Sequence, residues 1–182
     1  DISVQEYNQD HYEVVVVDDN STDTTADIAR SIRGIKNLRV ISNSGKGKKQ
    51  AVRTGIEASA GSFAVTTDAD CRVGRKWLKT IASFAEEKQP LMTISRVVIN
   101  AGRGFFNRFQ ELEFLSLQGI TAGTAAMGSP VMCNGANLGI EKEAWLRNAG
   151  RLHDELVSGD DVFLLHSLKS EGRPGIMWLE SD

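Results

Sequence analysis

The segment EVVVVDDNSTD, residues 13–23, is the clearest indication of the fold. Its consecutive valines predict a strand, Glu13–Val17, that is apolar on both faces, as strands of parallel sheets are. The polar residues that follow, Asp18–Asp23, include several side chains able to cap the N-terminus of a helix. A strand that leads through a polar loop into a helix is the repeating unit of α/β proteins.

The same alternation of strand, loop and helix continues along the chain. After the first strand we expect, in chain order, a helix at Thr25–Ile32, a strand at Leu38–Ser42, a helix at Gln50–Ala58, a strand at Ser62–Thr67, a helix at Arg75–Glu87, a strand at Leu91–Ile99, helices at Phe105–Gly119, Lys142–Asn148 and Val162–Ser170, and a strand at Ile176–Leu179. This order predicts an α/β domain with a mostly parallel central sheet and crossover helices. Because no repeat or linker interrupts it, residues 1–182 are interpreted as a single domain.

Composition excludes several classes of protein. The chain has 182 residues, of which 41% are hydrophobic and 25% charged, values that suit one soluble domain with a substantial core. A formal net charge of -3 gives no sign of a nucleic-acid or anionic-membrane partner. The cysteines, Cys71 and Cys133, lack metal-binding spacing and predict reduced thiols in the cytoplasm, with a single disulfide as the alternative. No apolar run reaches the roughly 18–20 residues of a membrane span.

Aspartate pairs follow two of the expected strands. Asp18 and Asp19 end the first strand, and Asp68 and Asp70 end the strand at Ser62–Thr67. Because the carboxyl ends of parallel strands meet at one edge of a sheet, these pairs should lie near each other. Like carboxylates repel unless a cation neutralises them, and their oxygens suit Mg²⁺ or Mn²⁺ bound together with substrate phosphates. The alternative is a set of polar turns, since aspartate favours turns.

The segment SGKGKK, residues 44–49, is a candidate phosphate site that we call the Gly-Lys loop. It leads into an expected helix, where backbone amides and lysine ammonium groups attract anions, although a solvated basic turn fits equally well. Neither Lys46 nor Lys48 precedes a Ser or Thr, so the loop is not a Walker P-loop. Gln50 replaces the third glycine of a dinucleotide-binding motif, which disfavours a nicotinamide-dependent oxidoreductase.

Five segments together resemble the ordered motifs of family-2 glycosyltransferases, which are inverting, nucleotide-sugar-dependent enzymes of the GT-A fold. The segments are VVVVDDNSTD at 14–23, GKKQAVRTGI at 47–56, TDAD at 67–70, NGANLGI at 134–140 and GDDVFL at 159–164. The resemblance implies a three-layer α/β/α fold. It also implies metal-assisted sugar transfer from a nucleotide-diphosphate sugar, first of all a UDP-sugar, to a glycan or lipid-linked acceptor, as in polysaccharide biosynthesis. The implied cofactor is Mg²⁺ or Mn²⁺.

The resemblance assigns roles to the nucleotide and metal positions. Asp19 matches the aspartate that hydrogen-bonds the nucleotide base, with Asp18 structural, and Lys48 matches the basic position that approaches the nucleotide. Asp68 and Asp70 match the Asp-x-Asp motif. In that motif the second aspartate contacts the metal, and the first contacts the ribose or a metal-bound water. A metal at Asp70 would stabilise the charge that develops on the leaving diphosphate.

The remaining positions concern the sugar and the acceptor. Gly135 and Asn137 match the loop beside the donor sugar and acceptor, and Asp161 matches the catalytic base that removes the proton of the attacking hydroxyl. Asp160 stands where the family has glutamate, so either carboxylate is a candidate base. Both residues also suit a helix N-cap, and one could cap while the other catalyses.

The resemblance further predicts that the chain is a fragment. The family's opening strand and its nucleotide-contacting segment would precede Asp1, which would leave a strand edge exposed. The family's later Gln-x-x-Arg-Trp-type motif would follow Asp182. Because many relatives continue into membrane helices, the full-length protein is expected to be cytoplasmic with a possible attachment to the cytoplasmic face of the membrane.

Two alternative functions fit parts of the sequence. Val16–Asn20 resembles the acidic pair of a phosphoacceptor receiver domain, with Asp68 near the place of its phosphorylated aspartate. The chain is too long for a receiver, however, and Asn134–Ile140 has no role in one. A non-catalytic nucleotide-sugar-binding domain of the same fold is the other alternative, and UDP binding without transfer or donor hydrolysis would indicate it.

Overall fold

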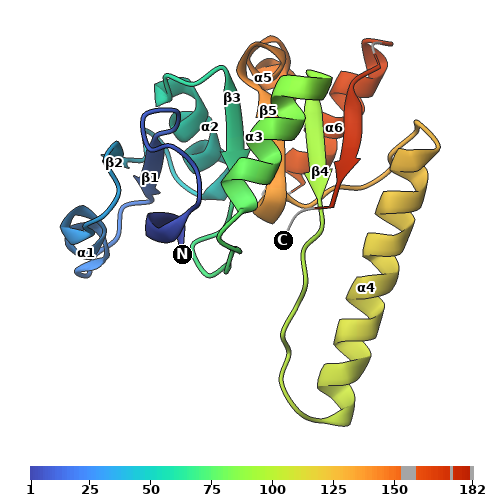
Figure 1. Cartoon of the computed structure of the whole chain (residues 1–182), viewed down its shortest axis with the longest axis horizontal. Coiled ribbons are helices and arrows are strands. Elements are labelled where there is room, and N and C mark those ends of the chain that lie inside the picture. The colour runs from blue at the N-terminus through green and yellow to red at the C-terminus, as the bar shows by residue number, and fades with distance from the viewer. Residues whose placement is uncertain (153–158, 173, 181–182) are drawn as a thin grey trace.

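The computed structural model describes residues 1–152, 159–172 and 174–180, in which strands and helices alternate as expected (Figure 1). The elements are β1 (Val14–Asp18), α1 (Thr25–Ser31), β2 (Leu38–Ser42), α2 (Lys48–Ala58), β3 (Phe63–Thr66), α3 (Trp77–Lys88), β4 (Met92–Ser95), α4 (Phe105–Ala126), β5 (Leu138–Glu141), α5 (Lys142–Asn148), α6 (Asp160–Ser170) and β6 (Ile176–Leu179). Short 3-10 helices occur at η1 (Ile2–Val4), η2 (Gly135–Asn137) and η3 (Ala149–Arg151).

The strands form two hydrogen-bonded sheets. β1 pairs in parallel with β2, and the second sheet has the order β3-β5-β4-β6. In this sheet β5 runs antiparallel to both neighbours while β4 and β6 are parallel, so three strands share one direction and β5 opposes them. The α/β class is confirmed, but the expected mostly parallel single sheet is corrected to a mixed one. β5 runs antiparallel to β4 because the chain leaves the sheet at the carboxyl end of β4 and re-enters it at that same end, where Ile94 pairs with Leu138.

Helices cover both faces of the four-stranded sheet, which makes the three layers. Ala64 of β3 packs in a large apolar cluster with α2, α5 and α6, whereas its neighbours Phe63 and Val65 pack with α3 on the other side. This is the alternation that a strand imposes on successive side chains. The large cluster centres on Met92, Ile140 and Leu165, which are all fully buried.

Helix α2 joins the two sheets. It contributes Ile56 to the large cluster, and its other side lies against β1. At that contact a Cβ built on Gly55 would lie only 3.1 Å from Cγ2 of Val17, so the glycine permits the close approach. In the described residues β1 and β3 each have one partner strand, so each keeps one strand edge unpaired.

Two elements differ in length from the expectation. β4 ends at Ser95, where its partner β6 also ends, rather than at Ile99. α4 continues to Ala126 rather than Gly119, until Gly128 with φ of +74° turns the chain. Figure 1 shows α4 (yellow) projecting from the body, beyond the sheet edge at which β4 ends. No helix in the described part of the chain is long and apolar enough to span a bilayer.

Candidate active site

A cavity of about 230 Å³ lies between α2, β3, η2 and the start of α6. Its floor is apolar and includes Ile56, Leu138 and Trp145 of the core. Its rim is polar and is formed by Lys48, Lys49, Thr66, Thr67, Asp68, Gly135, Asp160 and Asp161. Segments far apart in the sequence therefore converge on one hollow, and they include four of the seven residues proposed for the site.

Lys48 and Asp68 form an ion pair at the rim. Lys48 begins α2, Asp68 follows β3, and their Nζ and Oδ1 atoms are 2.7 Å apart. Partial burial lowers the pKa of Lys48, but the hydrogen bond and charge of Asp68, together with the charges of Asp160 and Asp161, outweigh it and raise the pKa overall. Two of the three expected nucleotide contacts, Lys48 and Asp68, thus lie together at the rim, where the charges of both candidate bases act on Lys48.

The carboxylate of Asp161 is oriented by η2. Its Oδ2 accepts a hydrogen bond of 2.9 Å from the Gly135 amide, and its Oδ1 accepts one of 2.8 Å from Val162 N–H. The hydroxyl of Thr66 donates to the Gly135 carbonyl at 2.7 Å, which ties the same loop to β3. The helix N-cap interpretation is wrong for both aspartates, because the N-cap of α6 is Gly159, no side chain of the described residues caps this end, and Asp160 and Asp161 lie in the first turn. Asp161 does line the cavity, as a catalytic base would.

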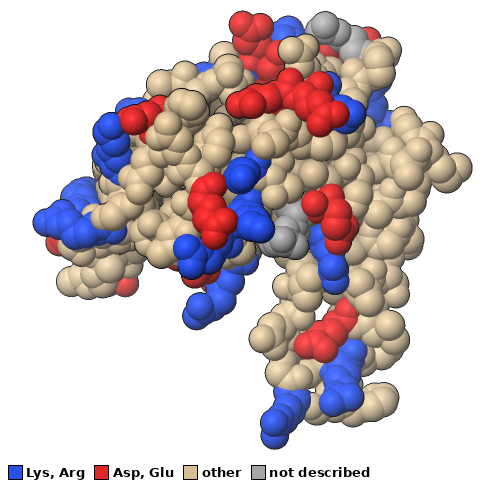
Figure 2. All heavy atoms as spheres, viewed as in Figure 1, with Lys and Arg blue, Asp and Glu red and all other residues tan. Residues whose placement is uncertain are grey.

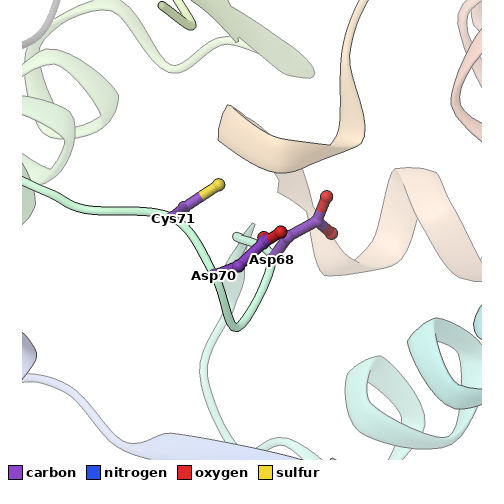
Figure 3. A group of neighbouring side chains, drawn as sticks. All are labelled: Asp68, Asp70 and Cys71. Atoms are coloured by element: carbon purple, nitrogen blue, oxygen red, sulfur yellow. The ribbon is translucent and has the colours of Figure 1, made fainter. Parts of the chain in front are cut away.

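Asp68 and Asp70 lie beside a third possible metal ligand. Figure 3 shows them with Cys71 on the loop after β3, and one ligand atom from each lies within 4.8 Å of the others. Two carboxylates fit Mg²⁺ or Mn²⁺, while a thiolate favours softer ions. Sequence reasoning treated Cys71 only as a reduced thiol, although its position directly after Asp70 was a signal.

Asp19 lies beside the Gly-Lys loop rather than among the cavity-lining residues. Its Oδ2 and Oδ1 accept hydrogen bonds of 2.9 and 3.1 Å from the amide of Gly47. Oδ1 also accepts a bond of 2.6 Å from the side chain of Asn43. Asn43, which the sequence did not single out, accepts bonds from Gly45 N–H and the Thr54 hydroxyl through its Oδ1. Asp19 therefore holds in place the loop that leads to Lys48.

Asn137 is not brought to the cavity. Its Oδ1 accepts a hydrogen bond of 3.0 Å from the Trp77 indole, and its Nδ2 donates one of 2.9 Å to the carbonyl of Arg96. The side chain thus connects α3 with the end of β4. Of the two positions expected beside the donor sugar and acceptor, only Gly135 lines the cavity.

Two lining residues escaped the sequence reasoning. Lys49 is buried, donates a hydrogen bond of 2.9 Å to the Leu152 carbonyl and lies 5.6 Å from the centre of the Phe163 ring. The hydroxyl of Thr67 is buried without a partner among the described residues. The sequence indicated both segments, the Gly-Lys loop and the TTDAD stretch, as parts of the site. No pattern indicated that Lys49 would be buried at the cavity as well as Lys48 lying at its rim.

Comparisons with known proteins identify the family and the fold. Residues 3–144 match the family described as Glycosyl transferase family 2. The chain is 26% identical over 160 residues to a beta-monoglucosyldiacylglycerol synthase of Nostoc sp., an alignment covering 85% of this chain and 34% of that protein. The fold is similar to S. aureus TarS 1-349 in complex with UDP, with a TM-score of 0.73, 20% identity and coverage of 100% of this chain and 54% of that one. It is also similar to the mannosyltransferase PcManGT from Pyrobaculum calidifontis in complex with GDP-Man and Mn²⁺, with a TM-score of 0.78, 21% identity and coverage of 98% and 48%. The chain thus spans about a third to a half of the length of these proteins.

Proposed function

Since this chain belongs to glycosyl transferase family 2 and has the GT-A fold, we propose that its cavity binds a nucleotide-diphosphate sugar and that the domain transfers the sugar with inversion. The observation that carries the proposal is the convergence of Lys48, Asp68 and Asp161 on one cavity from three separate segments. The TarS structure with UDP and the PcManGT structure with GDP-Man and Mn²⁺ support this class of donor. UDP is the first nucleotide to test.

Asp161 is the proposed base. In-line displacement at an anomeric carbon needs one group that takes the proton of the attacking hydroxyl from the side opposite the leaving group. Hydrogen bonds from Gly135 and Val162 hold the two oxygens of Asp161, so the carboxylate has a defined direction at the cavity rim. Asp160 also lines the cavity and is the alternative base.

Asp70 is the proposed metal ligand, with Asp68 and Cys71 close enough to share the ion. When bound, Mg²⁺ or Mn²⁺ would supply positive charge for the diphosphate leaving group. Lys48 lies at the same rim, and its ammonium can exchange Asp68 for a phosphate oxygen of the donor. These residues therefore position the diphosphate end of the donor.

Asp19 is the proposed contact for the nucleotide base. A carboxylate offers about four acceptor positions. The bonds from Gly47 and Asn43 occupy Oδ1 twice and Oδ2 once, so Oδ2 has room for one N–H of a base. The same residue would then position both the base and the Gly-Lys loop.

The acceptor is proposed to be a glycan or a lipid-linked hydroxyl compound, in a full-length protein that works at the cytoplasmic face of the membrane. The name of the Nostoc relative supports a lipid acceptor, since that protein is a beta-monoglucosyldiacylglycerol synthase. The family match argues against the receiver-domain alternative, which would not produce it.

Calorimetric titration of the chain with UDP, with and without Mn²⁺, tests the proposal. We expect binding that depends on Mn²⁺ and is lost in Asp70→Ala, while Asp27→Ala, an exposed aspartate on α1, serves as the matched control. An affinity for UDP that changes neither with Mn²⁺ nor with the Asp70 substitution would contradict the proposed site. Binding without release of UDP from a UDP-sugar would favour the non-catalytic alternative.

A further inference from the structure

The segment that follows β4 runs outward and turns back into α4, and we call the two together the α4 hairpin. Its outer end carries large apolar side chains that are exposed to solvent. We call residues 98–112 the α4 tip. Its most exposed apolar residues are Val98 (67%), Phe105 (89%), Phe106 (68%), Phe109 (55%) and Leu112 (60%). Such a group of aromatic and aliphatic side chains marks an interaction surface, because isolated exposed residues are common but contiguous patches are not.

The α4 tip stands away from the body. The buried residues of α4 are Gln118, Thr121 and Ala125, all in its C-terminal half, and none lies in the half that begins with the three phenylalanines. The Gln118 side chain accepts a hydrogen bond from Val97 N–H at 3.2 Å, so the hairpin is closed at its base. Figure 1 shows the N-terminal half of α4 extending past every other described element on that side of the molecule.

The charge at the tip is positive. Arg103 and Arg108 are the only basic residues between positions 97 and 141, and neither takes part in an ion pair within the described residues. Glu111 faces back into the hairpin, where it accepts a hydrogen bond of 3.0 Å from Ala101 N–H. Figure 2 shows the basic side chains at the extreme end of the projection and an acidic one farther up.

We propose that the α4 tip docks onto the surface of an anionic lipid bilayer. Phenylalanine and leucine side chains gain free energy on entering the boundary between headgroups and acyl chains, and arginines beside them pair with lipid phosphates. The occupant is a bilayer rather than a second copy of the chain because both arginines lie among the phenylalanines at one end of the helix. Exposed apolar side chains continue toward the other end, at Leu115 (54%), Ile120 (51%) and Met127 (84%), but no basic residue accompanies them.

The docking would turn the cavity toward the lipid. β3 and β4 both run antiparallel to β5, so they end at the same edge of the sheet. That edge carries the Asp68–Cys71 loop, and the α4 tip projects beyond it (Figure 1). A lipid-borne acceptor would then reach the cavity from the bilayer, although the docking itself does not depend on the proposed sugar transfer.

Vesicle flotation tests the docking. The chain should float with vesicles of phosphatidylcholine and phosphatidylglycerol, and much less with phosphatidylcholine alone. Replacing Arg103 and Arg108 by Gln should lower the affinity about 30-fold. Replacing Phe105, Phe106 and Phe109 by Ser should lower it at least about 100-fold. The matched controls are Arg33→Gln and Ile28→Ser, an exposed arginine and an isoleucine that is 62% exposed on α1.

Three outcomes would overturn the docking. They are failure of the unmodified chain to float with anionic vesicles, flotation that is unchanged in the tip variants, and light scattering that shows a dimer converted to a monomer by the Phe substitutions. The last would identify a second copy as the occupant. Circular dichroism and UDP titration of the same variants separate loss of docking from loss of fold or of the proposed nucleotide site.

Discussion

The amide of Gly135 donates a hydrogen bond of 2.9 Å to Oδ2 of Asp161, so the loop before β5 sets the direction of a carboxylate at the start of α6. A Cβ on Gly135 would lie 3.7 Å from that oxygen, which is ordinary contact rather than a clash. A side chain at position 135 would thus fit beside Asp161, but it would fill part of the space at the cavity rim. An asparagine at position 161 could keep only one of the two backbone hydrogen bonds, because only one of its two terminal atoms is an acceptor.

Asp161→Asn should abolish proton removal and preserve binding. The amide oxygen of the new side chain can still accept the Gly135 hydrogen bond, while its NH2 group loses the bond from Val162 N–H and the side chain cannot take a proton. We expect release of UDP from a UDP-sugar to fall at least about 100-fold, with the affinity for UDP retained. Asp160→Asn is the control and should lose less. A larger loss in the Asp160 variant would reverse the two roles.

Lys48→Met should weaken UDP binding about tenfold or more, because one charge-assisted hydrogen bond to phosphate is lost. The pKa of Lys48 is raised above its ordinary value of 10.5, so its charge is complete below that pH and is lost only above it. The difference in UDP affinity between Lys48→Met and the unmodified chain should therefore stay constant between about pH 7 and pH 9. A difference that disappears within this range would contradict the assignment. Titration calorimetry at several pH values measures it.

Mn²⁺ should protect Cys71 from alkylation, since Cys71 lies with Asp68 and Asp70 at the proposed metal position. Asp70→Asn should remove the protection, whereas Asp27→Asn should not. Mass spectrometry of the alkylated peptides distinguishes the two thiols. Burial, with the charges of Asp161 and Asp160, raises the pKa of Cys133, so this thiol should resist alkylation at neutral pH with or without metal. Equal modification of Cys71 in both conditions would argue against an ion there.

Asp19→Ala should loosen the Gly-Lys loop, because the amide of Gly47 and the side chain of Asn43 lose their acceptor. Since Asp19 is exposed, we expect the free energy of unfolding to fall by only about 1 kcal/mol, as measured with urea. The affinity for UDP should fall further than this stability change explains. Asp23→Ala, in the same polar segment, is the control. An unchanged UDP affinity in Asp19→Ala would exclude the proposed contact with the base.

Local patterns predicted several elements to the residue. The strands Leu38–Ser42 and Ile176–Leu179 and the helix Lys142–Asn148 agree with β2, β6 and α5, because turn formers or polar residues bound each segment in the sequence. The predicted ends of β4 and α4 were wrong. β4 ends where its partner β6 ends, and no pattern in the residues of β4 indicates the length of β6.

The site was predictable as a set of segments, but not as a set of contacts. Aspartates after strands predicted that the pairs Asp18/Asp19 and Asp68/Asp70 would meet at one edge of the sheet, but of these residues Asp68 lines the cavity and Asp19 bonds the Gly-Lys loop instead. The family resemblance, not the strand order, indicated Asp161, which lines the cavity. The bond between Asn137 and Trp77 depends on how α3 packs, and no short-range pattern contains that information.

Helix α2 bridges the β1–β2 ladder and the larger sheet through its two sides. Within the described chain, Asp19 and the Gly-Lys loop belong to the smaller ladder, while Asp68 and Asp161 belong to the larger sheet. A donor that contacts all of these residues would connect the smaller ladder to the larger sheet, as α2 does. Calorimetric melting should consequently sharpen into a single, more cooperative transition when nucleotide and metal are added.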